Sequence, residues 1–157
     1  PKIEDKPFYI DLGIYLERLD SPLMPLISQE INRAKSANLL RDVSIFYDDI
    51  GPVNLPVNAG FFNATDLWNF TGSLLVFSLP SLEKSIKYIN NYKQYYCFGW
   101  YNYNVLKMLE LLSTENIPTI ANSQDSYKNF YRLTSKTPIN VNKELVGVVD
   151  TILGNES

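Results

Sequence analysis

The N-terminal part of the sequence joins a strand-like segment to a helix-like one. Residues 7–15 form a dense apolar and aromatic run, which is typical of a strand buried on both faces. Ser21 and Pro22 suit a helix start, because serine accepts a hydrogen bond from a free N–H group and proline needs none. The apolar residues that follow recur at helical spacing: Leu23, Leu26, Ile27, Ile31 and Ala34. A strand feeding a helix predicts a parallel α/β sheet, whose ligands bind at the carboxyl ends of the strands.

The same alternation continues through the chain. Further strand-like segments occur at 42–47, 73–78, 94–100, 118–121 and 137–141. The later helices are expected to begin at four capping residues: Ser81, Asn104, Ser123 and Asn142. The sequence therefore predicts a single domain over residues 1–157. Its fold class is α/β, three-layer and Rossmann-like, with a mostly parallel sheet of about six strands and helices on both faces.

One segment, residues 50–72, has no long periodic pattern and is predicted to be a long loop. It is rich in Asn, Gly and Pro, yet it carries several large apolar side chains that we expect to pack against the sheet. A loop of this length in a compact domain is either functional or contains a further element. An edge strand near 55–58 and a short helical turn capped by Thr65 are the candidate elements.

Composition excludes several classes of function. The chain has no histidine, which removes the commonest general base and every Ser–His or Cys–His nucleophile pair. A net charge of −3 without a basic run argues against nucleic-acid or membrane partners. The single cysteine, Cys97, can form no disulfide within the chain, which favours a reducing, cytoplasmic location. No apolar stretch approaches the ~18–20 residues of a transmembrane helix.

No cofactor or metal is expected. The dinucleotide motif G-x-G-x-x-G and the P-loop motif G-x-x-x-x-G-K-[ST] are both absent, which argues against a nicotinamide dehydrogenase and a P-loop phosphotransferase.

Polar and aromatic residues near the predicted carboxyl ends of the strands indicate a ligand cleft. The candidate ligand-binding residues are Gly13, Asp20, Ser21, Ser78, Trp100, Tyr101, Asn122 and Ser123. Several precede helix starts, whose free amides attract phosphate or carboxylate groups. The alternative is that the serines and asparagines only cap helices. Trp100 and Tyr101 either form a stacking platform for a sugar ring or a base, or belong to the core.

Asp48 and Asp49 end the second predicted strand and are the candidate catalytic residues. Two carboxylates together could act as paired acid and base or hold a divalent cation. The alternative is a solvated strand end, because no third carboxylate stands at a recognisable spacing.

Residues 118–123, 131–134 and 138–142 carry a family resemblance. A strand ending in Ser, a helix ending in an aromatic–basic–Leu–Thr stretch and a short strand ending in Asn resemble the close of the N-terminal Rossmann-like domain of GT-B glycosyltransferases. Residues 48–69 are similar to glycosyltransferase-like proteins of tailed phages and marine bacteria. The resemblance implies binding of a sugar or nucleotide sugar, together with a partner domain or a second copy. Because that family holds its donor mainly in a second domain, we expect this chain to be incomplete for catalysis alone.

Two other classes of function stay open. One is a non-enzymatic Rossmann-like binding or assembly module that contacts a partner through the loops of Trp68 and Trp100. The other is a receiver-like signalling domain using Asp48 and Asp49, although Asn122 and Ser123 stand where such a domain needs a lysine.

Overall fold

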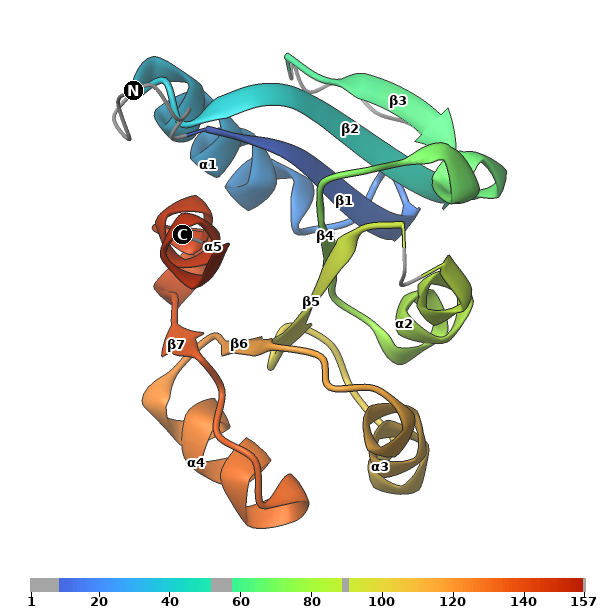
Figure 1. Ribbon diagram of the computed structural model, residues 1–157, viewed down its shortest axis with the longest axis vertical. Coiled ribbons are helices and arrows are strands. Elements are labelled where there is room, and N and C mark those ends of the chain that lie inside the picture. Colours follow the sequence, from blue (N-terminus) through green and yellow to red (C-terminus); the bar gives the residue numbers. More distant parts are fainter. Residues whose placement is uncertain (1–8, 52–57, 89–90, 157) are drawn as a thin grey trace, which may run out of the picture.

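Seven parallel strands form one sheet in the computed structural model, which describes residues 9–51, 58–88 and 91–156 (Figure 1). The strands are β1 (Ile10–Arg18), β2 (Leu40–Asp49), β3 (Gly60–Asn63), β4 (Ser73–Val76), β5 (Lys93–Phe98), β6 (Thr119–Ala121) and β7 (Asn140–Val141). The helices are α1 (Met24–Ser36), α2 (Leu79–Ser85), α3 (Val105–Thr114), α4 (Gln124–Thr134) and α5 (Val148–Glu156). The predicted three-layer, Rossmann-like α/β class is confirmed, with seven strands in place of about six.

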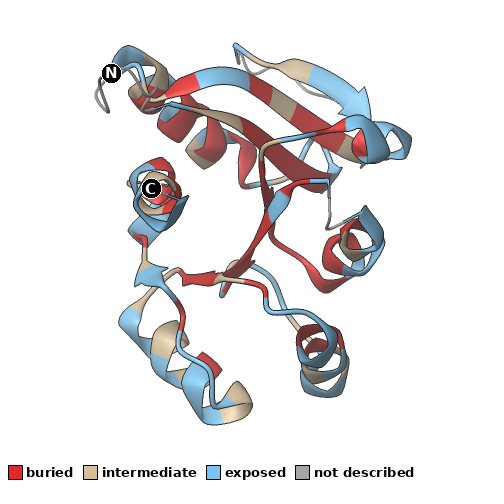
Figure 2. Ribbon diagram, viewed as in Figure 1, coloured by how far each residue is buried: buried red, intermediate tan, exposed pale blue. Residues whose placement is uncertain are grey.

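The sheet is doubly wound around β1. Its strand order is β3-β2-β1-β4-β5-β6-β7, so the chain moves outward from β1 in one direction and from β4 in the other. Helices α1 and α5 contribute to the hydrophobic core on one face, whereas α2, α3 and α4 contribute to the core on the other. The strands β1, β4, β5 and β6 are therefore largely buried between two helical layers, whereas the edge strand β3 is mostly exposed, as the colouring in Figure 2 shows.

The apolar run of β1 serves both cores, as the sequence predicts. Leu12, Ile14 and Leu16 belong to the core under α1 and α5, and Tyr15 belongs to the opposite one. The strand continues three residues beyond the predicted run, because its parallel pairing with β2 extends as far as Arg18 beside Asp49.

Two of the predicted helix caps are confirmed. Asn104 accepts a hydrogen bond from the Lys107 N–H at the start of α3, and Ser123 accepts one from the Ser126 N–H at the start of α4. Each satisfies a donor that has no partner within its helix.

Three other predicted helix starts are wrong. Helix α1 begins at Met24 and places Pro25, not Pro22, in its first turn. Helix α2 is capped by Ser78, whose Oγ accepts from the N–H of Ser81. Asn142 precedes a 3-10 turn at Lys143–Leu145 and makes no capping hydrogen bond through its side chain.

The region predicted as a long loop holds two elements. Strand β3 pairs with the outer edge of β2, and the 3-10 helix η2 (Ala64–Asn69) follows it directly. Asn63, not Thr65, caps this short helix by accepting from the Thr65 N–H. The edge strand expected near 55–58 falls mainly on residues 52–57, which lie outside the described residues.

Candidate functional site

A crevice lies where the sheet reverses its direction of winding. Beyond the carboxyl ends of the neighbouring strands β1 and β4, the chain turns toward opposite sides of the sheet. Ligands of doubly wound sheets bind at this topological switch point. The crevice has a volume of about 260 Å³. Its lining residues are Tyr15, Leu16, Glu17, Arg18, Asp20, Ser21, Pro22, Phe77, Ser78 and Tyr101.

The end of β1 supplies one wall of the crevice. Tyr15 is fully buried, and its hydroxyl donates to both carboxylate oxygens of Asp48 at 2.9 Å. Burial, reinforced by the Asp48 carboxylate, raises the pKa of Tyr15, so the phenol stays protonated at neutral pH. Lys84 completes the cluster with an ion pair to Asp48 at 3.1 Å. Tyr15 is thereby a fixed, neutral part of the wall.

Arg18 and Asp20 form a bidentate pair at the mouth of the crevice. Arg18 Nε donates to Asp20 Oδ1 at 2.9 Å, and Nη2 donates to Oδ2 at 3.0 Å. These bonds raise the pKa of Arg18 and lower the pKa of Asp20. Gly51 packs against the pair with a φ of +60°, and a Cβ there would lie 2.7 Å from Asp20 Cγ. The guanidinium of the crevice is therefore already balanced by a carboxylate of the protein.

A hydrogen bond across the crevice joins the loop after β1 to the loop after β5. Ser21 Oγ lies 2.6 Å from the Tyr101 hydroxyl, and either oxygen can be the donor. The same Ser21 Oγ accepts from the Leu23 N–H at 3.1 Å. These two loops are far apart in the sequence, so this contact fixes the width of the crevice on that side.

The two helix starts beside the crevice offer few free amides. Pro25 in the first turn of α1 and Pro80 in the first turn of α2 have no N–H. Ser21 and Ser78 each occupy an N–H group of their own loop or helix. The helix starts are therefore poor phosphate-binding sites, because several of their backbone N–H donors are absent or already bonded.

The structure brings four of the predicted site residues together in the crevice. They are Asp20, Ser21, Ser78 and Tyr101. Trp100 is half-buried and packs edge-on against Phe77, with ring centroids 5.7 Å apart, so its ring helps to support the crevice from the core side.

Gly13 does not belong to the carboxyl edge, and its predicted position there is wrong. It lies in the middle of β1, paired with Ser44 and Leu74 of the neighbouring strands. A Cβ at this position would lie 2.7 Å from the Phe70 ring. Glycine is therefore required here by close packing over the strand.

Asp48 and Asp49 do not face one another. They are consecutive residues at the end of β2, so their side chains point to opposite faces of the sheet. Asp48 is engaged by Tyr15 and Lys84, whereas Asp49 is largely exposed and lies 4.0 Å from Arg18 Nη1. Neither residue lines the crevice.

Asn122 and Ser123 hold neighbouring backbone in place. Asn122 Nδ2 donates to the Gly99 carbonyl at 2.9 Å, while its Oδ1 accepts from the Ser126 hydroxyl at 2.6 Å. Ser123 caps α4. Both lie at the carboxyl end of β6, beyond the lining of the crevice.

The sequence analysis missed Glu17, the remaining acidic side chain of the crevice. Glu17 is exposed, and its carboxylate has no hydrogen-bond or ion-pair partner among the described residues. Phe77, which forms the apolar floor together with Leu16, was also missed. The alternation of β1 was the available signal, since extending it by one step beyond Tyr15 places Glu17 at the strand end.

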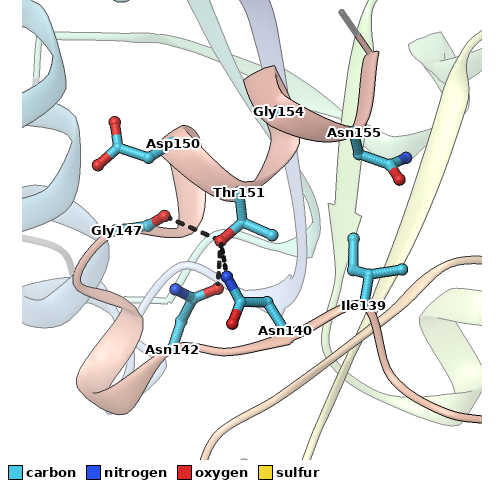
Figure 3. A pocket seen from close by; sticks show the side chains of 8 residues that line it. All are labelled: Ile139, Asn140, Asn142, Gly147, Asp150, Thr151, Gly154 and Asn155. Carbon is cyan, nitrogen blue, oxygen red and sulfur yellow. Dashed lines mark hydrogen bonds between the residues drawn. The ribbon is translucent and has the colours of Figure 1, made fainter.

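A second, larger hollow lies beside the edge strand β7 and α5, with a volume of about 560 Å³ (Figure 3). Three of its polar side chains bond to one another: Thr151 Oγ1 accepts from Asn140 Nδ2 and donates toward Asn142 Oδ1, and also toward the Gly147 carbonyl. Asp150 and Asn155 bond instead to Arg33 and Tyr95. This network secures the start of α5 against β7. Because this network already occupies polar groups that a ligand would need, the switch-point crevice is the better candidate site.

Across residues 9–51, 58–88 and 91–156, no group of three or more Cys, Asp or Glu side chains is arranged to hold a metal ion. In the same described ranges, no helix has the length and apolar character needed to cross a membrane.

Comparison with known proteins does not assign this chain to a family. We found no matching protein-family model, no matching curated protein and no matching solved structure.

Proposed function

We propose that this chain is a glycosyltransferase-like, sugar-binding domain whose switch-point crevice holds one neutral sugar ring. The observation that carries the proposal is the mixed lining of the crevice, which combines the aromatic residues Phe77 and Tyr101 with hydroxyl and carboxylate side chains. A sugar ring has apolar C–H faces that pack on aromatic rings and a rim of hydroxyls that hydrogen-bond to such oxygens. The small volume, below the ~300–1,000 Å³ of sites for drug-sized ligands, suits a single ring.

Glu17 and Ser78 are the proposed polar contacts, and Phe77 and Tyr101 the proposed apolar ones. A carboxylate is a pure acceptor and can take hydrogen bonds from two adjacent sugar hydroxyls. Among the described residues, none forms a hydrogen bond or ion pair with the Glu17 carboxylate, and we assign this role to it.

A nucleotide sugar fits the crevice less well than a free sugar does. A diphosphate needs cations or unoccupied amides, but Arg18 is held by Asp20 and the helix starts carry Pro25 and Pro80. The predicted catalytic residues Asp48 and Asp49 do not line the crevice, and we assign the Glu17 carboxylate to binding hydroxyls, so we propose no transfer step here. The proposal is therefore binding without turnover by this domain alone.

Saturation-transfer NMR tests this function. The probes are glucose, galactose, mannose, N-acetylglucosamine and uridine diphosphate, each added to the folded protein. We expect saturation of the ring protons of at least one sugar, loss of that signal in Glu17→Gln, and no saturation of uridine diphosphate. Glu115→Gln, which replaces an exposed carboxylate at the end of α3, is the matched control. Absence of saturation for all four sugars would contradict the proposal.

A second candidate, an assembly module, is favoured by the aromatic surface beside β3. This strand has a free sheet edge in the described residues, and Phe61, Phe62 and Trp68 around it are 39%, 41% and 59% exposed. Exposed apolar side chains next to an unpaired edge favour association with another chain. Light scattering across a range of concentrations distinguishes the two cases, since a strictly monomeric particle leaves the assembly module without self-association.

A further inference from the structure

The loop of residues 99–104 between β5 and α3, called the rim loop below, borders three hollows. Its Tyr101 lines both the crevice and a hollow of about 400 Å³ beside α4. Its Asn102 and Tyr103 line the hollow beside α4 and also a hollow of about 370 Å³ beside α2. The shared lining residues make the three hollows neighbours along the carboxyl rim of the sheet.

The start of the rim loop is anchored to the end of β6. Gly99 has a φ of +111°, and a Cβ there would lie 2.2 Å from Asn122 Oδ1. Asn122 in turn donates to the Gly99 carbonyl and accepts from Ser126, which holds its amide in one orientation. Asn122 therefore positions the rim loop and does not need to contact a ligand itself.

Three further residues of the rim loop, Tyr101, Tyr103 and Asn104, are anchored by contacts outside it. The ring of Tyr103 lies 4.8 Å from that of Phe98, and Tyr101 bonds to Ser21 across the crevice. Asn104 ends the rim loop as the cap of α3. A loop that is already ordered loses little conformational entropy when it binds a ligand.

The side chains of the rim loop are uncharged. The rim loop presents Trp, Tyr and Asn side chains and no charged one. The cations that line the three hollows are Arg18 and Lys107, and both are ion-paired; Lys107 Nζ lies 2.7 Å from Glu83 Oε2. A polyphosphate backbone would meet no unpaired cation among these lining residues, whereas aromatic faces beside amides match uncharged sugar rings.

We propose that the rim loop extends the crevice into a site for a neutral oligosaccharide, with one ring in the crevice and further rings along Tyr101, Asn102 and Tyr103. This inference rests on the proposed function, because it assigns the first ring to the crevice. Tyr101 stands between the first two positions and contacts the rings on both sides.

The test compares saccharides of increasing length on the full chain. Glucose, maltose and maltotriose, and the corresponding β-1,4-linked cellobiose and cellotriose, are titrated while amide shifts are recorded by NMR. We expect one trisaccharide to bind about tenfold tighter than glucose, as one or two added hydrogen bonds and a ring contact allow. We also expect it to shift the amides of 101–103 in addition to those of the crevice.

Two variants isolate the contribution of the rim loop. Asn102→Ala removes an exposed amide, and Tyr103→Phe removes only a hydroxyl and keeps the ring that packs on Phe98. Each should lower trisaccharide affinity toward that of glucose and leave glucose binding unchanged. Tyr131→Phe on α4, whose side chain is exposed and lines none of the three hollows, is the matched control.

The outcomes separate the two proposals. If glucose binds the crevice and no trisaccharide binds tighter, the oligosaccharide site is overturned and the proposed function stands. If no saccharide shifts any amide of the folded protein, both are overturned. Binding of a uridine hexanucleotide to the same amides would overturn the neutral-ligand assignment.

Discussion

The carboxylate of Glu30, in α1, accepts hydrogen bonds from the backbone N–H groups of Val149 and Gly147 at the start of α5. The distances are 3.1 Å and 3.3 Å, and Glu30 is only 4% exposed. Arg33 binds both oxygens of the same carboxylate at 2.8 Å and also lies 3.4 Å from Asp150. One acidic side chain thus joins the helix that follows β1 to the last helix of the chain.

Replacing Glu30 should destabilise the fold. Glu30→Ala leaves the N–H groups of Gly147 and Val149 and the partly buried Arg33 without their shared acceptor, so we expect a loss of about 2–3 kcal/mol in the free energy of unfolding. Urea denaturation followed by circular dichroism measures it. Glu115→Ala, at an exposed carboxylate, is the control and should change stability by no more than about 0.5 kcal/mol. Equal stability of the two variants would contradict the role assigned to Glu30.

Much of this fold could be predicted because strands and helices alternate with clear apolar patterns. The boundaries of these elements could not be predicted in the same way. Glu17 and Arg18 do not look like strand residues, yet β1 includes them because β2 pairs alongside as far as Asp49. Similarly, Ser78 and Ser81 are equally good caps, and Pro80 disfavours helical dihedrals at the residue before it. Tertiary packing decides where α2 begins, because a start at Leu79 buries both Leu79 and Leu82 in the core under this helix.

The candidate site was predictable only in part for the same reason. The rule that loops meet at the carboxyl ends of parallel strands correctly united Asp20 with Ser78 and Tyr101. The strand period of two separates Asp48 from Asp49, and this was readable from the sequence once the strand was assigned. The position of Gly13 in the middle of the strand could not be read from the sequence. It depends on where β1 ends and on the Phe70 ring that packs over Gly13.

Gly13→Ala should be destabilising by about 1–3 kcal/mol. The added methyl would lie 2.7 Å from the Phe70 ring and 3.0 Å from Leu74, so a buried aromatic side chain must shift. Gly154→Ala is the matched control. Gly154 lies within α5, and a Cβ added there would meet no heavy atom within 4 Å. There the helix propensity of alanine predicts a gain of about 0.5–1 kcal/mol. Thermal denaturation of the two variants should show shifts of opposite sign.

The thiol of Cys97 should be unreactive in the native protein. Cys97 lies near the carboxyl end of β5 with no exposed surface, and burial raises the pKa of its thiol, so little nucleophilic thiolate forms near neutral pH. We expect Ellman's reagent at pH 8 to label the native protein only as fast as the chain unfolds, and to label it at once in denaturant. Rapid labelling without denaturant would show that β5 opens locally.

The Arg18–Asp20 pair at the mouth of the crevice should be visible in the acid titration of Asp20. Hydrogen bonding to Arg18 lowers the pKa of Asp20 from its ordinary value of 3.8. Because the folded-state pKa is depressed, the pair stabilises the fold above the unfolded pKa, and this contribution is lost as the pH falls through the folded pKa. Carbon-13 NMR of the Asp20 carboxyl should give a midpoint below 3.8, and Arg18→Gln should move it back toward 3.8. Asp11, whose pKa is lowered by its hydrogen bond to Arg41, is the internal control, since the change at Arg18 leaves that pair intact. An Asp20 midpoint that stays the same in Arg18→Gln would show that the pair does not hold in solution, and Arg18 would then be free to meet an anionic ligand in the crevice.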